Sequence, residues 1–325
     1  MPRNLNISNY KKYWPFIVLL CIIFGIALSW VAAPGFFRIH PAHAQVSTIP
    51  PQWLEYDPRI DTMISQVDES EIYQTTYDLQ NFSTRVYPSP GNRQAAGYLY
   101  QRLENIPGLE TEYQGGAYQN IIATLPGRNA SSDKVFIVGA HYDSISPDPD
   151  HAPGATDNGC GVAIVLELAR IMSQYEFNNT IKFAFWNSEE TYPTGSGDYV
   201  SSAASNSLNI PLYFNFDSSG YDPDNQYVLD IMYDDDSAPI ADLLTHYNSL
   251  YDINFTLTYN VHTCGGDHIS FRKYGYPAIM THSQSHGTQA HTPNDTIDMM
   301  SPEFARKNAQ LGMSVLARLL EIRPD

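Results

Sequence analysis

The chain has 325 residues, 43% of them hydrophobic, which is enough for one large α/β domain or two small ones. Its formal net charge is −17, and the first 44 residues hold four basic residues and no acidic one, so residues 45–325 carry −21. Such a surface repels the phosphate backbone of nucleic acids, so we do not expect nucleic acid as a partner.

The first predicted element is an apolar segment over residues 14–33, which follows Lys11 and Lys12. About 20 apolar residues are enough to span a bilayer, and flanking lysines favour the cytoplasmic side. Ala42-His43-Ala44 fits a signal-peptidase site. We therefore expect residues 1–44 to be a signal peptide or signal-anchor. The remainder would be exported, either anchored to the membrane outside the cytoplasm or periplasmic or secreted after cleavage near Ala44.

After this segment the chain alternates between helical and strand patterns. Residues 45–58 are proline-rich and irregular and predict a linker, which leaves one domain over residues 59–325. In chain order the predicted elements are helices over 59–79 and 91–106, strands over 120–125 and 134–139, a helix over 160–175, strands over 180–186, 211–216 and 227–232, a helix over 238–251, a strand over 277–281 and a helix over 302–322. Strands that alternate with helices predict an α/β fold with a mostly parallel sheet covered on both faces.

Two cysteines, Cys160 and Cys264, lie outside the leader. An exported domain of this size does not need a disulfide framework. Whether these two pair depends on their distance, which the sequence leaves open.

Acidic residues and histidines follow several of the predicted strands. They are His141, Asp143 and Asp157 after strand 134–139, Glu189 and Glu190 after strand 180–186, Asp217 after strand 211–216, and His291 beyond the last strand. Open α/β sheets bind ligands outside the carboxyl ends of their strands. We therefore expect these side chains to meet at one edge of the sheet.

The same residues suit a zinc site. Zinc binds imidazole nitrogen and carboxylate oxygen, and a catalytic zinc ion keeps one position open for water. Two zinc ions about 3.5–4 Å apart need a shared carboxylate and two further ligands each. Alone, His141 is equally a structural histidine, Asp157 a helix N-cap, and Glu189-Glu190 a solvated acidic pair. Their joint occurrence at successive strand ends favours the metal site.

Five segments then establish a resemblance. GAHYDS, PGATDNGCG, FWNSEE, FNFDSSG and AHTPNDT resemble, in order and at about the same spacing, the M28 family of co-catalytic zinc aminopeptidases. With GNRQAAGYLYQRLENI and NIIATLPG the resemblance extends over nearly all of residues 80–320. It implies a three-layer α/β/α sandwich with a mixed sheet, and an M28-like peptidase domain after the linker.

The resemblance also implies a role for each motif residue. His141 and Asp217 would bind one zinc ion, Glu190 and His291 the other, and Asp157 would bridge the two zinc ions of the chain. The catalytic positions that the resemblance implies are Asp143, which would orient the His141 imidazole, and Glu189, which would act as general base. Glu189 would take a proton from a water of lowered pKa and pass it to the leaving amine.

Some positions depart from the family pattern. Many relatives read ADDNGSG where this chain reads ATDNGCG, so Thr156 replaces an acid and Cys160 a small polar residue. The stretch THSQSHGTQA before His291 is polar, whereas relatives that prefer large apolar N-terminal residues are aromatic-rich there. His282 and His286 in this stretch are better explained by a solvated loop than by substrate contact. His268 is interpreted as structural.

The function predicted is an extracytoplasmic zinc aminopeptidase that hydrolyses N-terminal residues from peptides. One alternative is a glutaminyl-peptide cyclotransferase, a single-zinc enzyme of the same fold whose motif lacks the continuation at Asn158-Gly159 and Gly161. Another alternative is a non-catalytic M28-like binding module, which would be expected to lack a ligand or the base. A dipeptidase or carboxypeptidase preference stays open, as do the oligomeric state and the preferred side chain.

Overall fold

The computed structural model describes residues 49–116, 119–191, 194–261, 265–284 and 289–324. The predicted signal peptide or signal-anchor, residues 1–44, lies outside these ranges. Among the helices of the described ranges, none combines the length and the apolar character needed to cross a bilayer.

A mixed sheet of eight strands forms the centre of the described chain, in the order β1-β2-β4-β3-β5-β8-β6-β7. The strands are β1 (Glu110–Gln114), β2 (Asn120–Leu125), β3 (Val135–His141), β4 (Thr180–Trp186), β5 (Tyr213–Phe216), β6 (Val228–Tyr233), β7 (Thr256–Val261) and β8 (Ala278–Ser283). Neighbours β4, β3, β5 and β8 run parallel, whereas β2 and β6 pair antiparallel with β4 and β8. The predicted mixed, mostly parallel sheet is confirmed.

Each central strand sends alternate side chains to opposite faces of the sheet, and both faces are apolar. In β4, Phe183 and Phe185 enter the larger hydrophobic cluster, whereas Ala184 and Trp186 enter the smaller one. A strand that is buried on both faces reads as a continuous apolar run. This is why the bounds of β2 and β4 are those that the sequence predicts.

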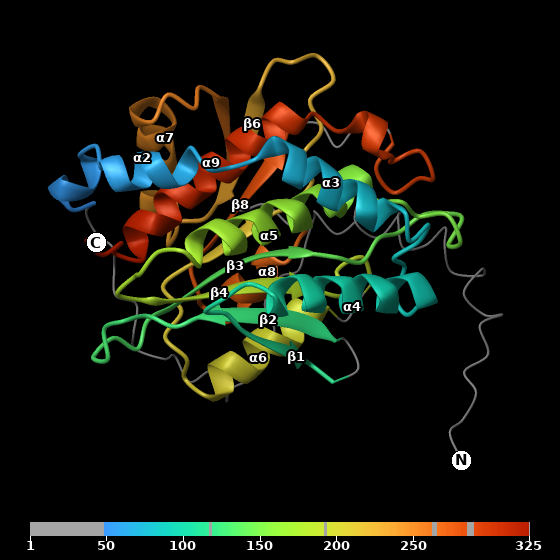
Figure 1. Ribbon diagram of the computed structural model, residues 1–325, viewed down its shortest axis with the longest axis horizontal. Coiled ribbons are helices and arrows are strands. Elements are labelled where there is room, and N and C mark those ends of the chain that lie inside the picture. The colour runs from blue at the N-terminus through green and yellow to red at the C-terminus, as the bar shows by residue number, and fades with distance from the viewer. Residues whose placement is uncertain (1–48, 117–118, 192–193, 262–264, 285–288, 325) are drawn as a thin grey trace, which may run out of the picture. The chain divides into compact units, whose positions relative to one another are not determined.

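Helices cover both faces, which gives the three layers (Figure 1). The larger cluster contains residues of α2 (Pro58–Ile64), α3 (Glu69–Gln80), α4 (Pro90–Glu104), α5 (Cys160–Met172), α7 (Ala238–Leu250) and α9 (Pro302–Leu319). The smaller cluster contains residues of α6 (Gly195–Ser205) and α8 (His268–Lys273). The predicted α/β/α sandwich is therefore confirmed.

Some elements differ from the sequence prediction. The single helix expected over residues 59–79 is two helices, α2 and α3, because Asp68 caps the second by accepting a hydrogen bond from the Ser70 amide. Strands β1 and β7 were not predicted, since both are largely exposed edge strands without an apolar pattern. Helix α6 is rich in glycine and serine and α8 has only six residues, so neither gives a helical signal.

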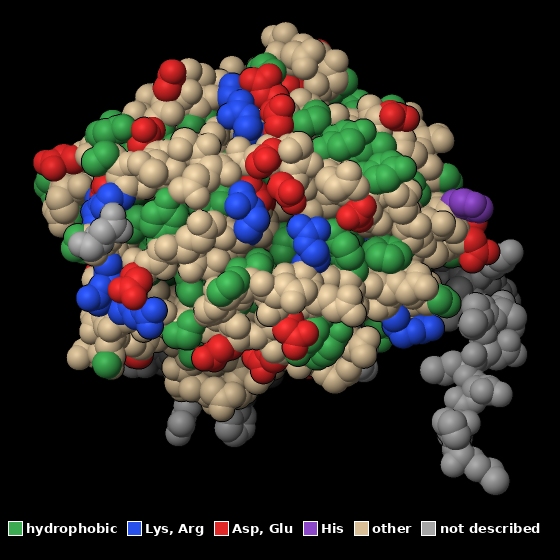
Figure 2. All heavy atoms as spheres, viewed as in Figure 1, with side chains coloured by type: hydrophobic (Ala, Val, Ile, Leu, Met, Phe, Trp, Pro, Cys, Tyr) green, Lys and Arg blue, Asp and Glu red, His purple; other side chains and the backbone are tan. Residues whose placement is uncertain are grey.

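Charged side chains are interspersed on the face that Figure 2 shows, where acidic and basic groups often lie beside each other. Exposed ion pairs in the described chain include Arg128–Glu176 at 3.1 Å and Arg102–Glu71 at 3.6 Å. The negative charge of residues 45–325 is therefore not gathered into one patch on this face. Surface pairs of this type contribute little to stability.

Residues 49–57, part of the predicted linker, lie against the domain, and we call them the N-terminal strap. They include the 3-10 helix η2 (Pro51–Leu54). Tyr247 Oη donates a hydrogen bond of 2.8 Å to the Trp53 carbonyl, and Arg318 Nη2 donates one of 3.0 Å to the Glu55 carbonyl. The Asp57 amide donates to Tyr251 Oη at 3.2 Å. The strap is thus bound to helices α7 and α9.

Replacing Arg318 tests how much the strap contributes to stability. Arg318→Met removes the bonds to Glu55 and Tyr247 and the 3.5 Å ion pair with Asp57. We expect the free energy of unfolding to fall by about 1–3 kcal/mol, measured by urea unfolding, because partly buried polar partners lose their hydrogen bonds. Arg306→Met, on the same helix with surface contacts, is the control and should change stability by less than about 1 kcal/mol. Equal losses in the two variants would contradict a role for the strap.

Candidate metal centre

The predicted site residues lie where the strand order of the sheet reverses. From β3 the chain passes to β4 on one side and then returns to β5 on the other side of β3. His141 is the last residue of β3, Glu189 and Glu190 follow β4, and Asp217 follows β5. A reversal of this kind opens a crevice at the carboxyl ends of parallel strands. The structure thus brings these residues to one edge, as the sequence predicts.

Asp157 reaches the same edge from the turn η3 (Ala155–Gly159) that precedes α5. The turn begins after Gly154, which has φ +52° and no space for a side chain, since a Cβ there would lie 2.7 Å from the Asp157 carbonyl. The Asn158 amide group donates to the Phe216 carbonyl at 2.9 Å. Gly161 packs so closely that a Cβ would lie 2.6 Å from the same carbonyl. The glycines and Asn158 therefore fix the start of α5 against the end of β5.

The Asp157 carboxylate faces two histidines with its two oxygens. Oδ1 lies 3.4 Å from His141 Nε2, and Oδ2 lies 3.0 Å from His291 Nε2. Burial alone would raise the pKa of Asp157, but hydrogen bonds to these two histidines hold the pKa below its usual value. The carboxylate therefore connects two separate groups of polar atoms.

Each histidine has a second carboxylate beside it. Asp217 Oδ1 lies 3.6 Å from His141 Nε2, and Glu190 Oε2 lies 3.2 Å from His291 Nε2. Ligand atoms about 2.0–2.1 Å from a tetrahedral zinc ion are about 3.3 Å from one another, so these separations suit a zinc ion in each group. Glu190 Oε1 is buried and has no hydrogen-bond partner among the described residues, as expected where a cation completes the site.

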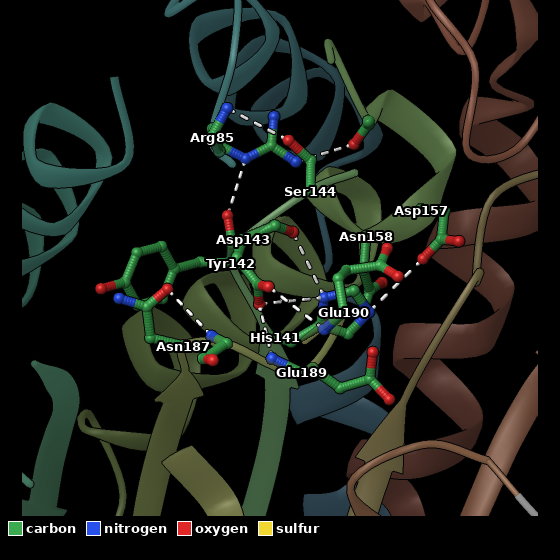
Figure 3. A network of polar contacts seen from close by, with 12 residues as sticks. Arg85, His141, Tyr142, Asp143, Ser144, Asp157, Asn158, Asn187, Glu189 and Glu190 are labelled. Carbon is green, nitrogen blue, oxygen red and sulfur yellow. Dashed lines mark hydrogen bonds and ion pairs between the residues drawn. The ribbon is translucent and has the colours of Figure 1, made fainter. Parts of the chain in front are cut away.

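Asp143 is buried beneath the site and holds the loop after β4 (Figure 3). Its carboxylate accepts hydrogen bonds from the amides of Glu189 at 3.0 Å and Glu190 at 3.2 Å. His141 Nδ1 lies 3.6 Å from Asp143 Oδ1 and 3.3 Å from the Asp143 carbonyl oxygen. Asp143 thus fixes the backbone that carries both glutamates, a contact that the sequence does not predict, and also lies beside His141.

Glu189 is partly buried at the same edge (Figure 3). Burial raises its pKa well above the usual value, and nearby Asp267 and Glu190 raise it further, although His141 opposes the shift. A buried carboxyl group with a raised pKa is suited to proton transfer.

Two residues at the site were missed by the sequence analysis. Asp295, buried with 1% exposure, accepts hydrogen bonds from the Thr156 amide, the Thr156 hydroxyl and the Asp157 amide at 2.9, 2.7 and 3.0 Å. It lies within the AHTPNDT segment, so its place four residues after His291 was an available signal. Arg85 is fully buried below the loop that leads to Asp157, and nothing in its sequence surroundings indicates this.

The polar stretch before His291 differs in part from its interpretation. His282 lies in β8 and is 2% exposed, so the solvated-loop interpretation is wrong for this residue. His268 is buried at the start of α8, where burial lowers its pKa to about 3. His286 and Cys264 lie outside the described ranges, and Cys160 is buried without a disulfide partner among the described residues.

Comparison with known proteins decides the family. Residues 120–316 match the sequence model of peptidase family M28. The chain belongs to this family. The predicted family and the predicted class of enzyme, a metallo-exopeptidase that hydrolyses peptide bonds, are thereby confirmed.

Individual M28-like proteins are similar to most of the chain. Leucine aminopeptidase 1 of Paracoccidioides brasiliensis (strain Pb18) is 26% identical over 310 residues, which cover 87% of this chain and 78% of that protein. The crystal structure of the LapA aminopeptidase of Legionella pneumophila has a TM-score of 0.72 at 20% identity, covering 82% of this chain and 76% of that one. A glutaminyl cyclase of Bacteroides thetaiotaomicron has a TM-score of 0.62 at 19% identity, covering 77% and 97%. The two structural likenesses show a shared fold.

The acidic cluster predicts how the stability of the metal-free protein depends on pH. Burial raises the pKa of Glu190 and Asp267 to about 7 and that of Asp295 to about 6. The folded state then holds protons that an unfolded chain releases from about pH 4 upward. Contacts with Asp157 and Glu190 raise the pKa of His291 to about 11, which extends the same trend above about pH 6.5. His268, whose pKa burial lowers to about 3, opposes the trend between about pH 3 and pH 6.5.

We therefore expect the free energy of unfolding of chelator-treated protein to fall as the pH rises from about 5 to about 8. Urea unfolding at both pH values measures the effect. The zinc-loaded protein is the control and should show a weaker dependence, because a bound cation keeps the carboxylates ionised. A metal-free protein that gained stability over this range would contradict the expectation.

Proposed function

We propose that this protein is a zinc-dependent aminopeptidase with two zinc ions, which removes N-terminal residues from peptides outside the cytoplasm. The observation that carries the proposal is the position of Asp157. Its two carboxylate oxygens face two different histidines, at 3.4 and 3.0 Å, and each histidine lies beside a carboxylate of its own. One shared carboxylate between two such groups is the ligand arrangement that a pair of zinc ions needs.

The ligands follow from the two groups. His141 and Asp217 would hold one zinc ion, Glu190 and His291 would hold the other, and Asp157 would be their shared ligand. Zinc at these residues would supply a water molecule of lowered pKa and polarise the peptide carbonyl. The buried, unpaired Oε1 of Glu190 supports this assignment, because a carboxylate oxygen left without a partner in the described chain is costly unless a cation binds it.

Glu189 is the general base of the proposed reaction. It follows β4 directly before a ligand, and burial raises its pKa well above the usual value. Its carboxylate takes a proton from the attacking water, and the resulting carboxyl group gives that proton to the leaving amine. Asp143 positions Glu189 through the 3.0 Å hydrogen bond from the Glu189 amide. It also assists His141, whose Nδ1 lies 3.6 Å from the Asp143 carboxylate.

The proposed location rests on the sequence of the leader. The apolar segment over residues 14–33 follows two lysines and precedes an Ala-x-Ala site. We place the catalytic domain outside the cytoplasm, either anchored to the membrane through this segment or released by cleavage near Ala44. Its partners there are peptides with a free N-terminus.

The second candidate function is that of a glutaminyl-peptide cyclotransferase. The similarity of the fold to the Bacteroides thetaiotaomicron glutaminyl cyclase favours it. Against it stand the second histidine–carboxylate group around His291, which a single-zinc enzyme does not need, and the Asn158 and Gly161 contacts with Phe216. The complete set of ligands, together with Glu189, also disfavours a non-catalytic binding module.

Elemental analysis and an activity panel test the proposal on residues 45–325. We expect about two zinc ions per chain. We also expect hydrolysis of aminoacyl chromogenic substrates and refusal of the same substrates with a blocked amine. One zinc ion with ring closure of an N-terminal glutamine peptide would establish the cyclotransferase instead. If the protein neither bound zinc nor turned over any substrate, the non-catalytic binding module would be the remaining function.

The Glu189→Gln substitution tests the general base. The amide keeps the shape of the side chain but cannot accept a proton, so we expect kcat to fall by at least about 100-fold while both zinc ions stay bound. Steady-state kinetics and zinc analysis on the same sample measure the two effects. Glu176→Gln, on the exposed surface, is the control and should be as active as the wild type. Loss of zinc from Glu189→Gln would show instead that Glu189 is a ligand.

A further inference from the structure

Arg85 is a buried cation just beneath the segment that leads to Asp157. Its guanidinium is fully buried and donates hydrogen bonds to backbone carbonyls. These acceptors, with their distances, are Leu79 (3.3 Å), Tyr142 (2.8 Å), Pro153 (2.5 Å) and Gly154 (2.8 Å). Burial lowers the pKa of Arg85 only to about 10, with Asp295 the foremost of the carboxylates that oppose the shift. The side chain therefore stays charged at neutral pH.

Asp295 is a buried anion bound to the next three residues of the same segment. Its backbone carbonyl accepts from the Ala155 amide at 3.0 Å, and its carboxylate accepts from the Thr156 and Asp157 amides at 2.9 and 3.0 Å. The Thr156 hydroxyl adds a bond of 2.7 Å. Asp295 thus binds the amides of a segment whose preceding carbonyls are bound by Arg85.

The two charges act on consecutive peptide groups of one short segment. The carbonyls of Pro153 and Gly154 point to the cation, and the amides of Thr156 and Asp157 point to the Asp295 carboxylate. The Ala155 amide binds the backbone carbonyl of Asp295 instead. Peptide dipoles are stabilised when the carbonyl end meets a positive charge and the amide end meets a negative one. Removing either charge leaves the other buried and less well compensated.

The segment has no room to move without disturbing this arrangement. A Cβ at Gly154 would lie 2.9 Å from Arg85 Nη2, 2.7 Å from Ser144 Cβ and 2.7 Å from the Asp157 carbonyl. Arg85 also connects the segment to the strand that bears His141, because its Nε binds the Tyr142 carbonyl and its amide binds Ser144 Oγ at 3.1 Å (Figure 3). The same cation therefore fixes both ends of the loop between His141 and Asp157.

We propose that Arg85 and Asp295 form one electrostatic clamp that positions the Asp157 carboxylate for both zinc ions. They are positioning residues, and the inference rests on the proposed function because it requires Asp157 to bridge. A backbone shift at Asp157 moves both of its oxygens, so weakening the clamp weakens both metal sites together. Partners of this kind, which hold a ligand without touching the metal, typically contribute 10–100-fold to metal affinity.

Zinc affinity measured by competition with a fluorescent chelator tests the clamp. The variants are Arg85→Met, Asp295→Asn and the double variant, with Arg85→Lys as the conservative change that keeps the charge. We expect each of the first two to raise the zinc Kd of both sites by about 10–100-fold. In the double variant the zinc Kd should rise by clearly less than the product of the two single increases, because the second substitution removes a charge that the first has already left uncompensated. Arg85→Lys should recover part of the affinity.

Glu167→Gln is the matched control for a general loss of stability. Glu167 is a buried acid on α5 that binds Arg170 at 2.6 Å and the Asp68 amide at 2.9 Å. We expect it to lower the thermal unfolding midpoint of the metal-free protein without changing the zinc Kd. If Glu167→Gln weakened zinc binding as much as Asp295→Asn does, a general loss of fold stability would explain both effects. The inference would then be wrong.

Other outcomes also decide between the two proposals. If the wild type binds two zinc ions and the clamp variants bind them equally well, the clamp is wrong and the proposed function stands. The clamp is also overturned if only one site is weakened, or if the single losses multiply in the double variant. A wild type without zinc would overturn the proposed function and the clamp together. Should Arg85→Met fail to fold, the near-isosteric Asp295→Asn and Arg85→Lys carry the comparison.

Discussion

The architecture of the site depends on one constraint, which is that carboxylates removed from water need compensating positive charge. Asp143, Asp157, Asp217, Asp267 and Asp295 are all at most 8% exposed, and most of them surround one end of β3. Asp143 and Asp295 are compensated by backbone amides, and Arg85 lies nearby. Among the described residues, the Asp157 and Asp217 carboxylates lie beside imidazole nitrogens. The fold therefore supplies its own compensation for Asp143 and Asp295, and under the proposed function zinc ions compensate Asp157 and Asp217.

The sheet positions three of the five proposed ligands. His141 and Asp217 come from the ends of β3 and β5 and Glu190 from the loop after β4, which share one edge because these strands are parallel. Asp157 comes from the turn η3, and His291 from beyond β8. The two residues of the proposed clamp come from elsewhere in the sequence, Arg85 from before β1 and Asp295 from beyond β8. The proposed ligands thus come largely from neighbouring strands, whereas the proposed clamp joins residues 210 positions apart in the chain.

This division explains what the sequence predicts well and what it does not. Buried strands such as β2 and β4 are continuous apolar runs, so their bounds and the ligands that follow them are visible in the sequence. The exposed edge strands β1 and β7 carry no such pattern. Asp295 lies inside a predicted motif, yet its role requires knowing that Thr156 and Asp157 lie beside it. Among the described residues, the Arg85 guanidinium donates its hydrogen bonds to backbone carbonyls, which every residue possesses, so no residue type in the sequence signals its partners.

The N-terminal strap has a consequence for the order in which the protein is completed during synthesis. Glu55 binds Arg318, its partner 263 residues later, and Arg59 binds Ile322 at the same separation. Translation at 5–20 residues per second leaves these early residues without their partners for about 13–50 s. Glu55 and Arg59 are therefore synthesised early but form these hydrogen bonds only after Arg318 and Ile322 have been synthesised.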